Sequence, residues 1–367
     1  MSVGPPGRPE AWRGPLVELE RVESEDPGPV LELLAEHGLA GEPGAQQGEV
    51  AVALLLGARG CAQLGDVPRS RPSPVAVPEC VAIAYRRGDG VKSPAGYCSV
   101  GQWSNSWSDQ EHAAAVESVR RAIARGDVYQ ANVVGHRSAP FTGDPVALAD
   151  ALVGLPGARY GGSVGGADWL VASASPEQLV RLESGRVSTV PIKGTSRDEQ
   201  ELRTSEKDRA EHVMIVDLER NDLARVTRPG SVEVDRLYAL SEWAGIWHAG
   251  SDVTGDLADG VTTADVLRAL LPGGSVTGAP KHAACGLLAE LEPVGRGPAM
   301  GAMGMVWPGG MDLGLTIRTI AAADGAVHLW AGGGITWSSD PAQEVAEAHA
   351  KAAPVQRALA QVRPSTS

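Results

Sequence analysis

The sequence predicts a layered α+β fold. Apolar runs typical of strands alternate irregularly with amphipathic helical segments, and residues 225–255 hold strand-like runs with no helical segment between them. A strict parallel βαβ array would place a helix between successive strands, so this pattern favours a mixed, layered arrangement. Neither an internal repeat nor a low-complexity linker divides the 367 residues, and we therefore predict a single structural domain.

The predicted elements follow from local periodicity and turn residues. Strands are expected where short apolar runs end at turn residues, at 50–56, 81–86, 127–134, 169–174 and 187–192. Helices are expected where apolar residues recur every three or four positions, at 29–37, 109–125, 205–218, 282–291 and onward from 341. Asp109 is the predicted N-cap of the second helix, and Gly126 is its predicted C′ residue.

Composition and charge narrow the class of protein. With 43% apolar and 21% charged residues, the chain has the make-up of a soluble globular protein. The formal charge of −13 and the lack of a basic stripe argue against a nucleic-acid partner, although a bound divalent cation could still attract an anionic substrate. The N-terminus lacks the apolar segment of a signal peptide, and the run at 50–56 is too short to cross a bilayer. We therefore expect a cytoplasmic protein without membrane contact.

The four cysteines are predicted to be reduced thiols. Cys61, Cys80, Cys98 and Cys285 are far apart in the sequence and form no C-x-x-C pair. In a chain of this length, that spacing argues against a zinc site or a disulfide framework.

A carboxylate stands on the apolar face of the predicted helix 205–218. Ser205, with Asp208 three residues later, resembles a capping box at the start of the helix. Glu211 shares its face with apolar residues at helical spacing, namely Met214, Ile215 and Leu218. A carboxylate on a buried face costs several kcal/mol unless it is paired or coordinated. Alternatively, Glu211 reaches solvent or an arginine near the helix end.

The C-terminal helix carries a second charged face. Asp340 is its predicted N-cap, followed by Pro341 at the first helical position. Glu344, Glu347 and Lys351 recur at i, i+3 and i+7 and so lie on one face. Two carboxylates and an amine make a platform for a divalent cation or for acid–base chemistry, or else an exposed face of solvated charge pairs.

Two glycine-rich stretches are candidate anion sites. Gly332, Gly333 and Gly334 follow a predicted strand and allow a ligand to approach the backbone closely, unless they form a bulge or a flexible turn. The loop 271–281 leads into the predicted helix 282–291, which starts next to a proline. This loop lacks the Lys-Ser/Thr pair of a Walker A loop, which favours a carboxylate ligand over a nucleotide.

Four further side chains are candidates for chemistry. Lys193 is expected in a tight turn before Gly194, where it is an exposed lysine or, in a dry pocket that lowers its pKa, a nucleophile or base. Glu177 lies in a turn between two predicted strands. Arg318 lies in an apolar run predicted as a strand, where it would require a buried anion. His248, read alone, is more typical of a structural histidine.

These segments, in this order, resemble the chorismate-utilising enzymes, which include anthranilate synthase component I, aminodeoxychorismate synthase component I, isochorismate synthase and salicylate synthase. The likeness covers roughly residues 127–351 and, more weakly, the N-terminal part. It is carried by the motifs SPEQ at 175–178, PIKGT at 191–195, KDRAEHVMIVDLERND at 207–222, GGSVTGAPK at 273–281, TIRT at 316–319 and AGGGI at 331–335.

The resemblance implies a fold and a role for each candidate. The fold would be two packed antiparallel β-sheets flanked by helices, with 1–100 as a divergent N-terminal part and 101–360 as the chorismate-binding catalytic region. Mg²⁺ would be bound by Glu211 and Glu347, with Glu344 beside it. Glu177 would assist departure of the ring hydroxyl. The residues that would hold or line the substrate are Gln130, His248, Ser275, Thr277, Arg318, Gly332, Gly333, Gly334 and Lys351.

Two positions indicate which group within the family this chain resembles most. The water-using members carry a lysine base where this chain has Gln130, so ammonia is the expected nucleophile. Aminodeoxychorismate synthases read PIKGT, as this chain does, whereas anthranilate synthases generally read PIAGT. The resemblance therefore implies that Lys193 adds to C2 of chorismate and that ammonia then enters at C4.

The implied product is 4-amino-4-deoxychorismate, the precursor of 4-aminobenzoate. Ammonia would come from a separate glutamine amidotransferase subunit, because this chain has no G-x-C-x-G elbow with nearby His and Glu. An anthranilate synthase component I is the nearest alternative. A chorismate-binding scaffold without catalysis is an alternative from another class of protein.

Overall fold

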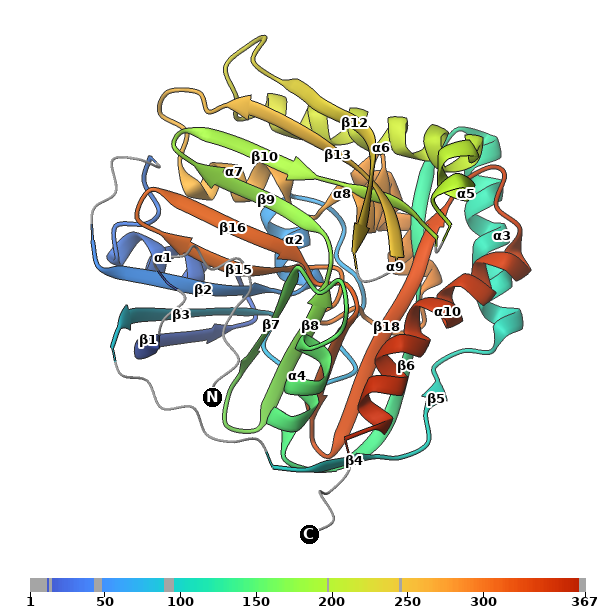
Figure 1. The fold of residues 1–367 in the computed structure, drawn as a ribbon, viewed down its shortest axis with the longest axis horizontal. Coiled ribbons are helices and arrows are strands. Elements are labelled where there is room, and N and C mark those ends of the chain that lie inside the picture. The colour runs from blue at the N-terminus through green and yellow to red at the C-terminus, as the bar shows by residue number, and fades with distance from the viewer. Residues whose placement is uncertain are drawn as a thin grey trace.

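Two antiparallel β-sheets pack against each other and form the body of the molecule (Figure 1). The computed structural model describes residues 12, 15–42, 48–88, 96–196, 198–243 and 246–362. The expected α+β fold with two packed antiparallel sheets and helices outside them is confirmed.

The larger sheet has ten strands in the order β1-β3-β2-β15-β16-β9-β10-β13-β11, with β12 paired to β13. The apolar run predicted as a strand at 50–56 is β2, and it is buried almost throughout. The strands of this sheet are β1 (Leu16–Ser24), β2 (Val50–Leu56), β3 (Cys80–Arg87), β9 (Gln178–Glu183), β10 (Arg186–Val190), β11 (Ile192–Ser196), β12 (Glu233–Trp243), β13 (Ile246–Asp256), β15 (Ala302–Trp307) and β16 (Gly310–Leu315).

The smaller sheet has eight strands along the order β14-β6-β18-β17-β8-β7, with β4 and β5 paired to β6. Its central pair, β6 and β18, stays in continuous register over ten residues of β18. The strands are β4 (Cys98–Val100), β5 (Ser104–Asn105), β6 (Gln130–Gly143), β7 (Tyr160–Gly165), β8 (Trp169–Ser175), β14 (Gly278–Ala279), β17 (Thr319–Ala323) and β18 (Ala326–Ile335).

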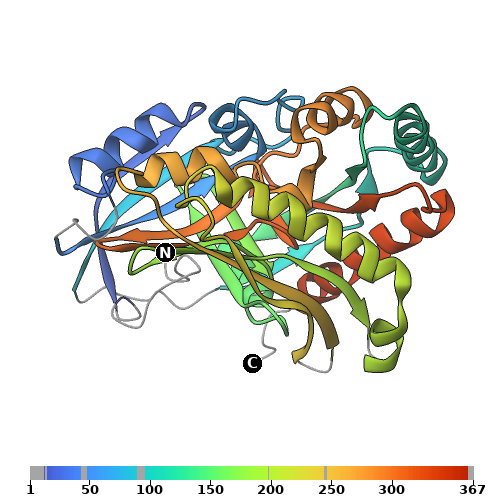
Figure 2. The ribbon, with the colours of Figure 1, turned by 90° about the horizontal axis from the view of Figure 1, so that it is seen from above.

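Helices cover the outer faces of both sheets (Figures 1 and 2). Apolar residues of α4 and α10 pack on the smaller sheet, while α3 and α9 enclose a second apolar cluster against β6. The long helix α6 lies across β10, β12 and β13 of the larger sheet (Figure 2). The helices are α1 (Gly28–Glu36), α2 (Ala58–Leu64), α3 (Asp109–Arg125), α4 (Pro145–Val153), α5 (Glu199–Thr204), α6 (Glu206–Ala224), α7 (Thr263–Leu270), α8 (Gly274–Thr277), α9 (Lys281–Leu291) and α10 (Pro341–Ala360).

Local capping chemistry sets some helix ends as predicted, whereas the helix predicted to end at Leu218 continues to Ala224. Gly126 ends α3 in the left-handed conformation, with a φ of 82°, and Ser205 caps α6. The predicted N-cap of α3 is wrong by one position. Ser108 is the cap instead of Asp109, because its hydroxyl accepts from the Glu111 amide and the Glu111 carboxylate accepts in return from Ser108.

All four cysteines are free and buried, as expected for reduced thiols. Among the residues that the structure describes, no helix combines the length and the apolar character needed to cross a bilayer.

Candidate active site

The three consecutive glycines lie inside strand β18 and form neither a bulge nor a flexible turn at its end. Gly332, Gly333 and Gly334 pair with residues 132–134 of β6. On the other side of β18, strand β17 pairs with residues 326–329 and does not reach the glycines. Among the described strands, only β6 therefore pairs with the glycine stretch. A side chain at Gly332 would overlap the carbonyl oxygen of Val133, so the close approach of these backbones requires glycine.

Helix α10 brings three charged side chains to the glycine stretch. Three of its polar atoms lie near the position that a Cβ at Gly333 would occupy: Glu344 Oε2 at 3.3 Å, Lys351 Nζ at 3.5 Å and Glu347 Oε1 at 3.6 Å. Lys351 Nζ also lies 2.6 Å from Glu347 Oε1 and donates to the carbonyl of the preceding glycine at 3.0 Å. The face predicted from the i, i+3, i+7 spacing therefore meets the backbone of β18.

Gln130 and Lys193 meet at the next glycine. A Cβ at Gly334 would overlap the Gln130 amide and would lie 3.4 Å from Lys193 Nζ. Gln130 is 1% exposed, and among the described residues neither its amide nitrogen nor its amide oxygen has a hydrogen-bond partner. Because a buried amide without partners costs free energy, this side chain is a candidate contact for a polar ligand.

Lys193 is part of strand β11, so the tight turn expected for it is wrong. Its backbone pairs with Ala249 of β13, and the register shifts at Gly194, whose φ is 71°. Glycine adopts that left-handed conformation without strain. The backbone conformation of Lys193 is set by pairing with a strand more than fifty residues away in the sequence. The residues next to Lys193 in the sequence do not predict this pairing.

Charges from three parts of the chain act on Lys193. Burial lowers the pKa of its ammonium group, while the carboxylates of Glu177, Glu211 and Glu347 raise it and the Lys351 charge lowers it further. Such interactions are strong only at short range, so strand β11, helix α6 and helix α10 share one electrostatic environment. The Oε1 atom of Glu211 is buried, as the apolar face of its helix predicts.

Glu177 links the glycine-rich loop to Lys193. It lies between β8 and β9, is 6% exposed, and accepts a hydrogen bond from Ser275 Oγ at 2.7 Å. Burial raises the pKa of the Glu177 carboxyl, while the Ser275 hydrogen bond and the Lys193 charge lower it. A buried carboxyl whose protonated form is favoured can deliver a proton.

Arg318 lies between two strands, so its assignment to a strand is wrong. β16 ends before it and β17 begins after it, and its φ of 50° is uncommon for a residue with a side chain. Burial lowers the pKa of Arg318, and the Glu177 charge raises it. Burial and then the Arg318 charge lower the pKa of His248. Arg318 therefore lies near both residues.

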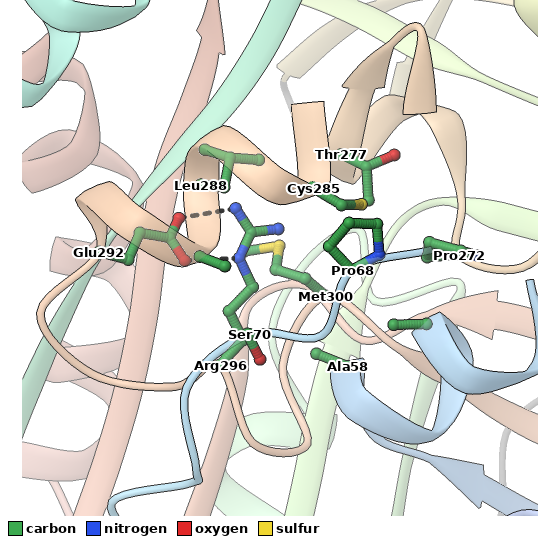
Figure 3. A pocket seen from close by; sticks show the side chains of 12 residues that line it. Ala58, Pro68, Ser70, Pro272, Thr277, Cys285, Leu288, Glu292, Arg296 and Met300 are labelled. Atoms are coloured by element: carbon green, nitrogen blue, oxygen red, sulfur yellow. Dashed lines mark hydrogen bonds and ion pairs between the residues drawn. The ribbon is translucent and has the colours of Figure 1, made fainter. Parts of the chain in front are cut away.

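Thr277 faces a different space from the other candidates. Its hydroxyl donates to the Gly273 carbonyl at 2.8 Å, and its side chain lines a small recess between α2 and α9 (Figure 3). The same recess contains a buried ion pair, in which Arg296 Nη2 lies 2.6 Å from Glu292 Oε1. A substrate contact for Thr277 stays a prediction.

Three carboxylates are the candidate metal ligands. Glu344 and Glu347 converge beside Gly333, and both Glu211 and Glu347 act on the charge of Lys193. In the part of the chain that the structure describes, no three His, Cys, Asp or Glu side chains are grouped to hold a metal ion by themselves. Carboxylate oxygens suit Mg²⁺, which is usually held by one or two carboxylates together with water and substrate oxygens. The residue types suit an ion of that kind, and binding of Mg²⁺ stays a prediction.

One buried charge cluster was not predicted from the sequence. Lys281 Nζ lies 2.5 Å from Asp222 Oδ2, and Glu219 is buried on the same helix as Asp222. The available signal was the i, i+3 spacing of two acids on α6. No local pattern connects them to a lysine that follows a loop far along the chain.

These side chains form a candidate site for a small anionic molecule. Lys193, Lys351, Glu344 and Glu347 converge on a strand whose glycines admit close approach, and the charges of Lys193, Glu177 and Arg318 act on one another's pKa values in a chain from Lys193 to Glu177 to Arg318. Such perturbed groups gather where proteins bind and transform ligands.

Comparison with known proteins assigns the family. The model for chorismate binding enzymes matches residues 89–357. Anthranilate synthase component 1 of Streptomyces coelicolor is 41% identical over 258 residues, which are 67% of this chain and 50% of that protein. Aminodeoxychorismate synthase component 1 of Bacillus subtilis is 36% identical over 274 residues, which are 71% of this chain and 58% of that protein. The chain belongs to the chorismate-binding enzyme family and spans about half the length of these relatives.

A solved structure supports the same fold. Anthranilate synthase component I from Streptococcus pneumoniae superposes with a TM-score of 0.80 at 24% sequence identity, covering 95% of this chain and 94% of that one.

Proposed function

We propose that this chain is component I of an aminodeoxychorismate synthase, which converts chorismate and ammonia to 4-amino-4-deoxychorismate. The observation that carries the proposal is Lys193 in its PIKGT motif, with its amine beside Gln130 and Gly334 and its pKa lowered by burial. An amine with a lowered pKa is neutral more of the time, and the neutral amine is the nucleophile.

The reaction proceeds in two displacements. Lys193 Nζ bonds to C2 of chorismate while both ring double bonds shift by one position and the C4–O bond breaks. Glu177 gives its proton to the departing hydroxyl, which leaves as water. Ammonia then bonds to C4, both ring double bonds shift back, and the C2–Nζ bond breaks, which returns the lysine amine and leaves the enolpyruvyl ether intact. The proton shed by the new amine restores the Glu177 carboxyl.

The remaining candidates bind and orient the substrate. Arg318, Lys351 and the backbone of the glycine stretch would hold its carboxylates, with His248 and Ser275 lining the site. Glu211, Glu344 and Glu347 would hold Mg²⁺, which supplies positive charge for a substrate carboxylate when bound.

Gln130 supports ammonia as the nucleophile. A neutral amide cannot take a proton from water, but its oxygen can accept a hydrogen bond from ammonia. We infer that a glutamine amidotransferase subunit supplies the ammonia, in line with the component 1 names of the relatives.

Anthranilate synthase component I is the second candidate, favoured by the 41% identity to the Streptomyces protein. That enzyme would aminate C2 and release pyruvate. The two reactions therefore differ in a measurable by-product.

The test is product analysis with chorismate, MgCl₂ and an ammonium salt at alkaline pH. We expect an aminated product with the enolpyruvyl group retained and no pyruvate, and we expect Glu347→Ala to abolish turnover. Anthranilate together with an equal amount of pyruvate would overturn the choice. Chorismate binding without turnover, even with an amidotransferase subunit supplied, would favour a scaffold.

A further inference from the structure

The glycine-rich loop between α7 and α9 is held at both ends by one side chain. Lys281, the first residue of α9, donates from Nζ to the carbonyl of Leu270, the last residue of α7, at 3.1 Å. The same nitrogen lies 2.5 Å from Asp222 Oδ2 on α6. The side chains of Lys281 and Asp222 are only 12% and 5% exposed. One amine therefore closes the loop 271–280 and ties it to α6.

The middle of this loop enters the candidate active site at two places. Ser275 Oγ donates to Glu177, the proposed acid, at 2.7 Å. Further along, Ala279 pairs with Gln130 of β6, whose amide lies against Gly334. A displacement of the loop would move both contacts at once.

The loop also rests directly on α6. A Cβ at Gly274 would overlap the Leu218 side chain and would lie 3.3 Å from Glu219 Oε1. Burial, and then the charge of Asp222, raise the pKa of Glu219 to about 8, whereas Lys281 lowers it and Glu177 raises it. The pKa of Glu219 therefore responds both to the Lys281–Asp222 ion pair and to Glu177, the proposed acid.

We propose that Lys281 is a positioning residue, whose ion pair with Asp222 and hydrogen bond to Leu270 fix the loop 271–280 so that Ser275 meets Glu177. A buried ion pair adds little stability compared with a well-packed apolar pair, because both charges must be desolvated. The role we assign to the ion pair is to hold the loop in position, because one nitrogen contacts a carboxylate on α6 and a backbone carbonyl on α7.

The test separates positioning from stability. Lys281→Met leaves a buried carboxylate unpaired, so it should lower Tm. The double variant Lys281→Met/Asp222→Leu should recover Tm, because the pair becomes apolar. Arg268→Met is the control, since it removes an exposed cation paired to Asp265 on α7.

Backbone hydrogen exchange is the first readout and needs no substrate. We expect amides of residues 273–277 to exchange at least about tenfold faster in the double variant than in wild type, and at the wild-type rate in Arg268→Met. Wild-type exchange in the double variant would overturn the inference, whatever reaction the enzyme catalyses.

Kinetics is the second readout, and it alone rests on the proposed function. With chorismate and ammonia, kcat of the double variant should fall at least about tenfold, by more than KM rises. Recovery of kcat together with Tm would reduce Lys281 to a structural role. If wild type makes no aminated product while loop exchange responds as expected, the proposed function fails and the positioning role stands.

Discussion

Lys193 and Glu177 have pKa values shifted toward each other, and this fits opposite roles in one reaction. Burial lowers the pKa of the lysine and raises that of the carboxyl, so both groups move toward their neutral forms. A neutral amine can attack and a protonated carboxyl can donate. The mutual attraction of their charged forms opposes both shifts, so the protonation of each group is sensitive to a charged ligand bound nearby.

Lys193→Ala should remove the proposed nucleophile while chorismate binding is largely retained. We expect the rate of amination to fall by roughly a thousandfold or more, while the chorismate Kd changes by less than about threefold. Calorimetric titration with chorismate and a single-turnover assay check the two halves of this prediction. Normal turnover by Lys193→Ala would exclude a covalent role for the lysine.

Glu177→Gln should slow the loss of the C4 hydroxyl, because an amide cannot deliver a proton. A general acid commonly contributes about 10²- to 10⁴-fold, so kcat should fall by that amount. Glu183→Gln, an exposed change on the adjoining strand β9, serves as the control. Equal kcat values for wild type and Glu177→Gln would contradict the assignment.

At the scale of elements, strand β18 must both pair closely with the backbone of β6 and contact the charged side chains of α10. Its glycines let β6 approach closely on one side and let the charged face of α10 meet the strand. Helix α10 begins where Asp340 caps the Gln343 amide, and its apolar residues pack on the smaller sheet. This packing places the turn that carries Glu344 and Glu347 next to Gly333.

Gly332→Ala tests this element directly. The new Cβ would overlap the Val133 carbonyl and lie 2.7 Å from Val134 Cα, so strand β6 or β18 must shift. We expect a loss of about 2 to 3 kcal/mol in the free energy of unfolding, measured by urea denaturation.

Gly286→Ala on α9 is the matched control. Its Cβ would make an ordinary contact of 3.7 Å with Pro68, and alanine favours a helix interior by about 0.5 to 1 kcal/mol. This variant should be neutral or slightly more stable. Equal effects of the two substitutions would mean that the close approach of β6 and β18 is not what requires glycine.

At the scale of the whole molecule, an acidic protein buries several of its acids. Burial raises the pKa of Glu79 to about 7 and that of Asp312 to about 6. Glu79 lies 3% exposed and accepts from the Arg59 amide at the start of α2. For such a group the folded state holds a proton that the unfolded chain has already lost. Its stability contribution is complete below about pH 4.5 and is lost as pH rises through about 7.

Glu79→Gln isolates that contribution, because glutamine mimics the protonated carboxyl at every pH. Relative to wild type, the variant should gain up to about 3 kcal/mol of stability as pH rises from 5 to 9. Urea unfolding at several pH values gives this difference directly. A difference that stays flat, or that grows toward acid pH, would contradict a raised pKa for Glu79.

The sequence predicted several features that local chemistry decides, although it placed the N-cap of α3 one residue late, and it missed features that distant pairing decides. Ser205 and Gly126 end their helices as expected, because a cap acts on amides or carbonyls within one turn. Lys193 was misplaced because a strand partner far along the chain sets its backbone, and Arg318 was misplaced because the chain leaves strand β16 before it and enters β17 after it. Lys281 was overlooked because its partners, Asp222 and Leu270, lie on two other helices. The sequence therefore identified the candidate residues but did not predict how they are arranged in space.

The position of the new nitrogen tests the central claim most directly. Chorismate is incubated with the enzyme, MgCl₂ and ¹⁵N-labelled ammonium chloride, and the product is examined by NMR. We predict that ¹⁵N couples to the C4 proton of the ring and that the enolpyruvyl methylene signals remain. A product with ¹⁵N on an aromatic C2, accompanied by free pyruvate, would contradict amination at C4 and the role of Lys193.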